Sequence, residues 1–297
     1  MKDFVVRHIG PSEKDQQTML SALGLESLDQ LIDVTVPASI RCKTLELEAP
    51  LSEVEALNRL QEIASQNKVY RSYLGMGYHN THTPNVILRN LIENPSWYTS
   101  YTPYQAEISQ GRLEALLLFQ TMVQDLTAME ISNCSLLDEA TAAAEAMSMA
   151  FKLANPKRKK GATKDIFLVS KDCHPNTISV VQGRAEPLGI SVQVADSESF
   201  DITESVFAVL LQYPATNGVV RDYQKTIELA QQQGALAILA VDMLALCMLK
   251  APGEMGADIV VGNTQRFGVP LGYGGPHAAY FATKEAYKRS IPGRIIG

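Results

Sequence analysis

Two residues in the second half of the chain combine a chemically versatile side chain with a position where ligands often bind. His174 stands in KDCHPNT, directly after the apolar run DIFLVS, and Asp242 ends the apolar run LAILAVD. A lone histidine in this position is as consistent with a structural role as with a functional one. The carboxylate of Asp242 could cap a following helix or hold a protonated ring nitrogen. Both residues are therefore candidates for a ligand site.

A third candidate is the start of an alanine-rich helix in LLDEATAAAEAMSMA (136–150). The first amides of such a helix point outward and can bind a phosphate. Asp138 and Glu139 stand at this start, however, and their carboxylates compete for the same amides and the same helix dipole. We therefore favour a helix start that is capped by its own side chains. A phosphate site, with Thr141 among its residues, is the alternative.

A fourth candidate is the glycine- and proline-rich loop in VGNTQRFGVPLGYGGPH (261–277). A loop that follows a strand in an α/β chain often carries the reactive partner of a cofactor. Its segment GYGGP (272–276) also raises the alternative of a nucleotide-binding dehydrogenase. That alternative is weak, because these glycines follow the last core strands and lack the G-x-G-x-x-G spacing that opens a first βαβ unit.

These four places fall at the ends of predicted elements. Short apolar runs predict strands at 165–170, 190–195, 206–214, 236–242, 258–262 and 278–283, and helical patterns predict helices at 139–154, 175–186 and 222–233. Strands that are apolar on both faces and alternate with helices indicate a mainly parallel sheet that is covered on both sides. Ligands of such sheets bind beyond the carboxyl ends of the strands, so we expect the chemistry there.

The chain before this region has a mostly helical pattern. Ser12 with Asp15, and Ser52 with Glu55, fit the S/T-x-x-D/E pattern, in which a hydroxyl and a carboxylate cap free backbone donors at a helix start. Gly24 is placed to end the first helix in the left-handed conformation. Helical capping signals of this kind continue through the first third of the chain.

A long helix is predicted at the end of this helical region. The run GRLEALLLFQTMVQDL (111–126) has apolar residues at nearly every core-facing position, which predicts a buried helix. The residue pattern changes soon afterwards. We therefore expect a helical N-terminal region at 1–127 and an α/β domain at 128–297.

Composition limits the classes of partner. The chain is 46% hydrophobic and 20% charged, with a net charge of -6 and a pI near 5.5, as in ordinary soluble globular proteins. An acidic balance argues against nucleic acid and anionic membrane as partners, since both select a basic face. The basic run Lys157–Lys160 is interpreted as a solvated loop.

Localisation and thiol chemistry follow from what the sequence lacks. It has no apolar stretch of the roughly 20 residues that span a bilayer, and its N-terminus resembles neither a signal peptide nor a transit peptide. We expect a cytoplasmic protein, or one of the mitochondrial matrix if the chain is a processed form.

The four cysteines are widely spaced along the chain, at Cys42, Cys134, Cys173 and Cys247. This spacing favours buried free thiols over disulfides or a metal site.

Five segments make the chain similar to one known family. They are RHIGP (7–11), RSYLGMGY (71–78), YTPYQAEISQGRLEALL (101–117), QRFGVPLGYGGPHAAYF (265–281) and PGR (292–294). They resemble the P-protein of the glycine cleavage system, the decarboxylating glycine dehydrogenase, from about Arg7 onward. The resemblance implies an enzyme of fold type I among the pyridoxal-phosphate-dependent transferases. It also implies a longer protein of two related halves, so we expect this chain to be a fragment or a truncated reading frame that lacks the small C-terminal domain.

The resemblance assigns expected roles to the candidates. In that fold His174 would stack on the cofactor ring, Asp242 would pair with the pyridinium nitrogen, and Thr141 would lie at the phosphate. Gln265 stands where the catalytic lysine would be, and an amide nitrogen is not nucleophilic. Arg266 cannot replace the lysine because a guanidinium stays protonated. We therefore expect no catalytic residue in this chain and a vestigial cofactor site, in which Ala140 replaces a glycine of the family and hinders a close phosphate approach.

The resemblance also implies the activity and the partners. The family decarboxylates glycine as an aldimine of pyridoxal phosphate and passes the aminomethyl group to the lipoyl arm of the H-protein, with a lysine-bearing second half that lies outside this chain. Residues of the first half reach the edge of that active site, and the best candidates here are Tyr101, Tyr104, Gln105 and Glu107. Two other interpretations stay open for these four residues. They form a turn in which the tyrosines pack and Glu107 caps the next helix, or the whole chain is a purely structural and interaction module.

Overall fold

The computed structural model describes residues 5–8, 10–42, 46–156 and 164–297, and these form two compact units. The first unit is Met1–Arg71 and the second is Ser72–Gly297. The units meet between residues 71 and 72, so residues 72–127 belong to the same unit as the sheet. The predicted boundary between residues 127 and 128 stays a prediction. The basic run at 157–160 lies outside the described residues.

The first unit consists of helices whose starts follow the predicted capping pattern. Its helices are α1 (Val5–His8), α2 (Glu13–Ala22), α3 (Leu28–Thr35) and α4 (Glu53–Ser65). Ser12 and Asp15 form a reciprocal capping box at α2, and Ser52 and Glu55 form another at α4. Gly24 has φ +72° just after α2, which confirms the predicted left-handed helix end.

The second unit begins with short helical segments and one long helix. They are α5 (Asn85–Ile87), the π-helical turn η1 (Leu88–Ile92), α6 (Pro95–Tyr98), the 3-10 turn η2 (Ala106–Ile108) and α7 (Gln110–Thr127). The predicted long helix is thus present as α7. The expectation that it is buried is wrong, because Leu117 and Leu118 are 46% and 63% exposed. Only one side of α7 packs, against the sheet near Val123.

A seven-stranded sheet forms the centre of the second unit, in the order β1-β7-β6-β5-β4-β2-β3. The strands are β1 (Ile131–Ser132), β2 (Ile166–Ser170), β3 (Ser191–Ala195), β4 (Val206–Tyr213), β5 (Leu236–Val241), β6 (Ile259–Asn263) and β7 (Ala279–Thr283). The strands from β3 across to β6 are parallel, whereas β7 is antiparallel to both β6 and β1. The mainly parallel sheet and its six predicted strands are confirmed. The short edge strand β1 was not predicted, since two residues carry no periodic signal.

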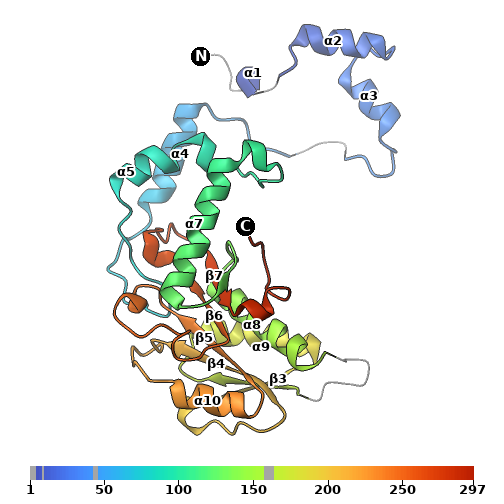
Figure 1. The fold of residues 1–297 in the computed structure, drawn as a ribbon. Helices are drawn as coiled ribbons and strands as arrows, with labels where there is room; N and C mark the ends of the chain where they lie inside the picture. Colours follow the sequence, from blue (N-terminus) through green and yellow to red (C-terminus); the bar gives the residue numbers. More distant parts are fainter. Residues whose placement is uncertain (1–4, 9, 43–45, 157–163) are drawn as a thin grey trace. The chain divides into compact units, whose positions relative to one another are not determined.

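Helices cover both faces of this sheet, as predicted (Figure 1). The covering helices of the second half are α8 (Glu139–Ala154), α9 (Pro175–Ala185) and α10 (Gln224–Gln232), and short 3-10 turns follow at η4 (Glu186–Leu188), η5 (Ser197–Ser199), η6 (Ala245–Cys247), η7 (Gln265–Phe267) and η8 (Glu285–Tyr287). Along β2, Phe167 faces the core under α8 and α9, and Leu168 faces the core under α7 and α10. Both cores are continuous across the strands, so the strand ends are held in fixed positions.

The cysteines only partly match their predicted environment. Cys134 and Cys173 are buried, whereas Cys42 and Cys247 are exposed, and all four thiols are free. The expectation of buried thiols is therefore wrong for Cys42 and Cys247. Cys247 ends the short turn η6, which lies on the surface rather than in an apolar strand. No helix in the described part of the chain is both long enough and apolar enough to cross a membrane.

Candidate functional site

The predicted strand ends come together around one cavity in the second unit. The cavity has a volume of about 250 Å³ and lies at the carboxyl ends of β4, β5 and β6 and at the start of α8 and α9. Its polar lining includes His79, Glu139, His174, Gln212, Thr216, Asp242, Asn263 and Arg266. His174 and Asp242 were predicted for this place, whereas Thr141 and Gln265 do not line it. We refer to it below as the strand-end cavity.

Asp242 is engaged by an arginine. The Nε of Arg266 donates to its Oδ1 at 3.0 Å, and Nη2 of Arg266 donates to Oδ2 at 2.8 Å. This two-point geometry matches the planar guanidinium to the planar carboxylate, and it makes a strong charge-assisted pair. Asp242 also accepts from the backbone N–H of Leu244 at 3.1 Å, as a capping residue does. Its carboxylate is therefore neutralised from within the chain.

His174 is buried at the N-terminal end of α9 and is held in its neutral form. Burial, followed by the charge of nearby His79, lowers the pKa of His174 to about 4. Nδ1 of His174 lies 2.8 Å from Oγ1 of Thr216, which fixes the orientation of the ring. A neutral imidazole can accept or donate one hydrogen bond but brings no charge to the cavity.

Glu139 lies in this site, whereas the sequence analysis placed its carboxylate at the amides of the helix start. It is 5% exposed, and burial raises its pKa to about 7 against the hydrogen bonds that favour its charged form. Oε2 accepts from Nδ2 of Asn263 at 2.6 Å, and Oε1 accepts from Nε2 of Gln212 at 3.3 Å. Oε1 also lies 3.9 Å from Nε2 of His174. The first residue of α8 thus turns into the cavity instead of capping its own helix.

Asp138 alone caps α8, which agrees with the favoured interpretation of this helix start. Its Oδ1 accepts from the backbone N–H of Thr141 at 2.7 Å, and the Thr141 hydroxyl returns to the Asp138 carbonyl at 3.0 Å. Both polar groups of Thr141 therefore bond to Asp138. The Cβ of Ala140 is buried beside them, at 4% exposure. The amides at this helix start are poorly placed to receive a phosphate.

Gln265 ties the glycine-rich loop together. The residue is 1% exposed, and its Oε1 lies 3.0 Å from Nδ1 of His277, at the far end of the loop. Its Nε2 donates to the carbonyl of Val269 within the loop, and its backbone N–H donates to Oδ1 of Asn263 at 3.1 Å. The side chain is fully used inside the protein. Gln265 therefore stabilises the loop itself.

The loop also packs on a segment that sequence reasoning did not connect with it. The hydroxyls of Thr81 and Thr83 donate to the carbonyls of Val269 at 3.0 Å and Gly268 at 2.6 Å. Gly268 has φ +102°, and a Cβ at this position would lie 3.2 Å from the His82 carbonyl oxygen. Within this chain, the crossing that requires Gly268 is with residues 81–83.

A neighbouring segment at 75–79 forms part of the cavity wall. Gly77 has φ +83°, and a Cβ there would lie 3.2 Å from Cδ2 of His174 and 3.6 Å from Nδ2 of Asn263. Tyr78 accepts a hydrogen bond at its hydroxyl from Asn176 at 3.3 Å. The close approach of Gly77 to His174 explains why a side chain is disfavoured at this position of RSYLGMGY.

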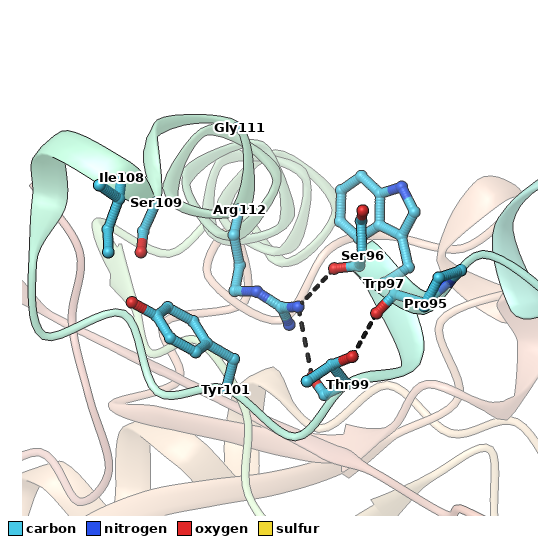
Figure 2. Close-up of a pocket in the computed structure, with 9 residues that line it drawn as sticks. All are labelled: Pro95, Ser96, Trp97, Thr99, Tyr101, Ile108, Ser109, Gly111 and Arg112. Carbon is cyan, nitrogen blue, oxygen red and sulfur yellow. Dashed lines mark hydrogen bonds between the residues drawn. The ribbon is translucent and has the colours of Figure 1, made fainter. Parts of the chain in front are cut away.

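A second cavity, of about 670 Å³, lies at the start of α7 (Figure 2). Arg112 points across it, and its Nη2 donates to the carbonyls of Ser96 at 2.8 Å and Thr99 at 3.4 Å. Its guanidinium carbon lies 6.0 Å from the centre of the Tyr101 ring. The hydrogen bonds of Arg112 therefore link the start of α7 to α6 and to the loop that follows α6.

Of the four predicted edge residues, Tyr101 alone is among the residues that line this second cavity, and Tyr104, Gln105 and Glu107 follow it in an exposed segment. Tyr101 is 43% exposed and lines the cavity, and Tyr104 is 85% exposed. Gln105 and Glu107 are also exposed, at the turn η2. Among the described residues, Glu107 has no hydrogen bond to the first turn of α7, so the interpretation as packed tyrosines and a capping carboxylate receives no support. The structure does not bring these four residues into the strand-end cavity.

Known proteins share both the sequence and the fold. The family model of the glycine cleavage system P-protein matches residues 6–297. The glycine dehydrogenase (decarboxylating) of Nostoc sp. is 58% identical over all of this chain, and that of Pelagibacter ubique is 54% identical, yet the chain spans about 30% of the length of each of these curated relatives.

Solved structures agree with the family model. A crystal structure of glycine decarboxylase (P-protein) of the glycine cleavage system, in inhibitor-bound form, has a TM-score of 0.88 and 34% identity, over 97% of this chain and 65% of that one. A sphingosine-1-phosphate lyase of Burkholderia pseudomallei, at 11% identity and a TM-score of 0.62 over 87% of this chain, shares the fold alone. The fold is that of the fold type I pyridoxal-phosphate-dependent enzymes. The chain belongs to the glycine cleavage system P-protein family.

Proposed function

We propose that this chain is the N-terminal part of a P-protein that decarboxylates glycine and passes the aminomethyl group to the lipoyl arm of the H-protein. The family match over residues 6–297 and the names of the relatives support this activity. The chain spans about 30% of the curated relatives, so a second, lysine-bearing half completes the enzyme, in the same chain or as a separate subunit. The bacterial sources of these relatives support the cytoplasm as its compartment.

The family and the fold imply pyridoxal phosphate in the complete enzyme, but the strand-end cavity of this chain does not fit that cofactor. Asp242, the residue for a pyridinium nitrogen, is paired with Arg266. The start of α8 is capped by Asp138, and the adjacent Glu139 carboxylate would face a phosphate. Gln265 gives this proposal its strongest support. Its amide is buried and hydrogen-bonded within the loop, and an amide nitrogen cannot form the Schiff base that a lysine forms.

We infer that the contribution of this chain to the reaction lies at its surface. Tyr101, Tyr104, Gln105 and Glu107 are exposed in one short segment, and their hydroxyl, amide and carboxylate groups could orient a substrate carboxylate or position a proton at the edge of the second half's active site. Apolar side chains of η1, α6 and α7 are exposed as well, as expected for a surface that another half covers. They include Leu91, Ile92, Trp97, Tyr98, Leu117 and Leu118.

The test uses the complete P-protein, with both halves present. Tyr101→Phe, Tyr104→Phe and Glu107→Gln are introduced singly, and the exchange of the glycine carboxyl group with bicarbonate is measured. A hydroxyl or carboxylate that acts at the transition state is worth about 10²–10⁴-fold in rate. We expect at least one of the three variants to lose exchange activity by about that factor while the two halves remain assembled.

A purely structural role is the second candidate, and the exposed apolar side chains favour it equally. In that case all three variants keep the exchange rate of the unaltered enzyme. Leu118→Ser, which removes an exposed apolar side chain of α7 without touching the polar segment, then weakens the assembly of the halves in sedimentation. The two candidates are thereby separated, since one predicts a loss of rate in assembled enzyme and the other predicts a loss of assembly alone.

A further inference from the structure

The strand-end cavity presents two buried oxygen acceptors on one side. Gln212, on β4, is 2% exposed, and its Oε1 has no hydrogen-bond partner among the described residues. Glu139 lies next to it, with its Oε1 3.3 Å from Nε2 of the same glutamine. Both residues line the cavity of about 250 Å³. An unpartnered buried acceptor is costly, so a cavity that offers two acceptors favours a ligand that donates hydrogen bonds.

The charges around the cavity do not cancel. The Asp242 carboxylate is balanced by Arg266, which gives it both Nε and Nη2. Glu139 receives hydrogen bonds only from the neutral amides of Asn263 and Gln212, and the nearest ionisable base, His174, is neutral. Once Glu139 is ionised, the lining carries one negative charge without a cationic partner. A buried charge of this kind is stabilised by a ligand of opposite charge.

The available ligand atoms favour an ammonium group over a metal ion. Calcium takes six to eight oxygen ligands, and magnesium takes six in a nearly regular octahedron. The described residues contain no group of three or more His, Cys, Asp or Glu side chains that could hold a metal ion. An ammonium group needs only a few acceptors, each of which takes one N–H, and it brings the missing positive charge.

We propose that the strand-end cavity binds a small primary ammonium ligand, which donates N–H groups to the Glu139 carboxylate and to Oε1 of Gln212. Two sources share this chemistry. One is the free ammonium ion, and the other is a small zwitterionic amino acid such as glycine, whose carboxylate would face Arg266 across the cavity. The site is separate from the surface segment around Tyr101 that the proposed function uses, so either proposal can fail without the other.

Binding is measured on the full chain by isothermal titration calorimetry and by shifts of amide signals in nuclear magnetic resonance spectra. The probes are ammonium chloride, methylammonium chloride and glycine, with sodium chloride and sodium glycolate as matched controls for ionic strength and for the carboxylate. We expect saturable binding of at least one ammonium probe and none of the controls. Binding of ammonium without binding of glycine identifies the free ion as the ligand. Binding of glycine without binding of methylammonium identifies the zwitterionic amino acid as the ligand.

The variant Glu139→Gln keeps the shape of the side chain and removes its charge, and we expect it to weaken binding at least tenfold. Glu145→Gln is the matched control, because Glu145 lies on the same helix but pairs with Arg184 away from the cavity. It should bind as the unaltered chain does. Circular dichroism and a cooperative melt establish that each variant is folded, and Gln212→Met replaces Glu139→Gln if the latter fails to fold.

Three results would overturn the proposal. The first is the absence of saturable binding by all three ammonium probes. The second is an unchanged affinity in folded Glu139→Gln or, where that variant does not fold, in Gln212→Met. The third is equal binding of sodium, which would make the site a general monovalent cation site rather than an ammonium site.

Discussion

Oε1 of Gln265 lies 3.0 Å from Nδ1 of His277, and the two residues close the glycine-rich loop at its base. The same side chain donates to the carbonyl of Val269, so its amide is used at both ends. A position that carries a cofactor-binding lysine must leave that side chain free to react. Under the proposed function Gln265 occupies that position, and its amide is bonded to His277 and Val269 instead.

A lysine introduced at residue 265 should therefore not create a cofactor site. We expect that Gln265→Lys, mixed with pyridoxal phosphate and reduced with borohydride, gives no lysine adduct at unit stoichiometry, because Asp242 is paired with Arg266 and α8 is capped by Asp138. The variant should also be destabilised by several kcal/mol, because a buried ammonium replaces a satisfied amide. Mass spectrometry after reduction and urea unfolding measure the two effects. The unaltered chain serves as the control, and a stoichiometric adduct at residue 265 would contradict the assignment of a vestigial site.

The burial of Glu139 predicts how stability depends on pH. Its pKa is raised to about 7 in the folded chain from an ordinary value of 4.5, so the folded state favours the protonated form. The stabilisation from this group is complete below pH 4.5 and is lost as the pH rises through 7. In Glu139→Gln that loss is absent, so the variant should gain stability relative to the unaltered chain by about 3 kcal/mol between pH 4.5 and 8.

Urea unfolding at a series of pH values measures this difference. Glu145→Gln is the appropriate control, because its carboxylate is paired with Arg184 on the helix surface. Its stability relative to the unaltered chain should change little over the same range. Parallel curves for Glu139→Gln and the unaltered chain would mean that Glu139 titrates normally.

His174 should produce the opposite trend in an overlapping range. Its pKa is lowered to about 4 from 6.5, so the folded state favours the neutral ring. The stabilisation is present above pH 6.5 and is lost as the pH falls through 4. His174→Asn retains a group that can reach Thr216 and removes the titration, so its stability relative to the unaltered chain should rise by about 3 kcal/mol from pH 7 to pH 4. His82→Asn, at an exposed position, provides the control for the loss of a histidine.

Nuclear magnetic resonance gives a direct check on the same histidine. The ring carbon signals of His174 should show no titration between pH 5.5 and 8, because both limits lie above a pKa of about 4. A titration midpoint near 6.5 would show that the ring is hydrated and is not held neutral by burial.

Much of the fold could be predicted from the sequence because its signals are local. The residues at 206–211 and 236–241 are apolar at every position, as expected for strands covered on both faces, and the structure has β4 and β5 there. Ser12 and Asp15 carry a complete capping pattern within four residues, and the capping box is present. The exposure of α7 could not be predicted, because an apolar helix does not reveal which of its faces has a neighbour inside the chain.

Only candidates at or just after a predicted strand end could be expected from the sequence. His174 and Asp242 were expected at strand ends, and both line the cavity, because Asp242 directly follows β5 and His174 lies four residues after the end of β2. The pairing of Asp242 with Arg266 joins two different strand ends, and no local pattern reports it. Glu139 was interpreted only as a competitor at a helix start, because the sequence does not show that α8 directs its first side chain toward Asn263. These contacts depend on the three-dimensional arrangement of the sheet.

Gly262, in the middle of β6, gives the most localised test of the fold. A Cβ at this position would lie 2.2 Å from the Val241 carbonyl oxygen and 2.5 Å from the Tyr280 hydroxyl oxygen, and that hydroxyl donates to the same carbonyl at 2.9 Å. Gly262→Ala must therefore displace a buried tyrosine and a strand backbone, and we expect it to lower the free energy of unfolding by about 3 kcal/mol or more.

Gly183→Ala on α9 is the matched control, since no atom lies within 4 Å of its new Cβ. Alanine should raise the stability there by up to about 1 kcal/mol, because it favours the helix. Urea unfolding of the two variants side by side measures both effects, and equal stability would mean that β6 and β7 do not approach each other as closely as described.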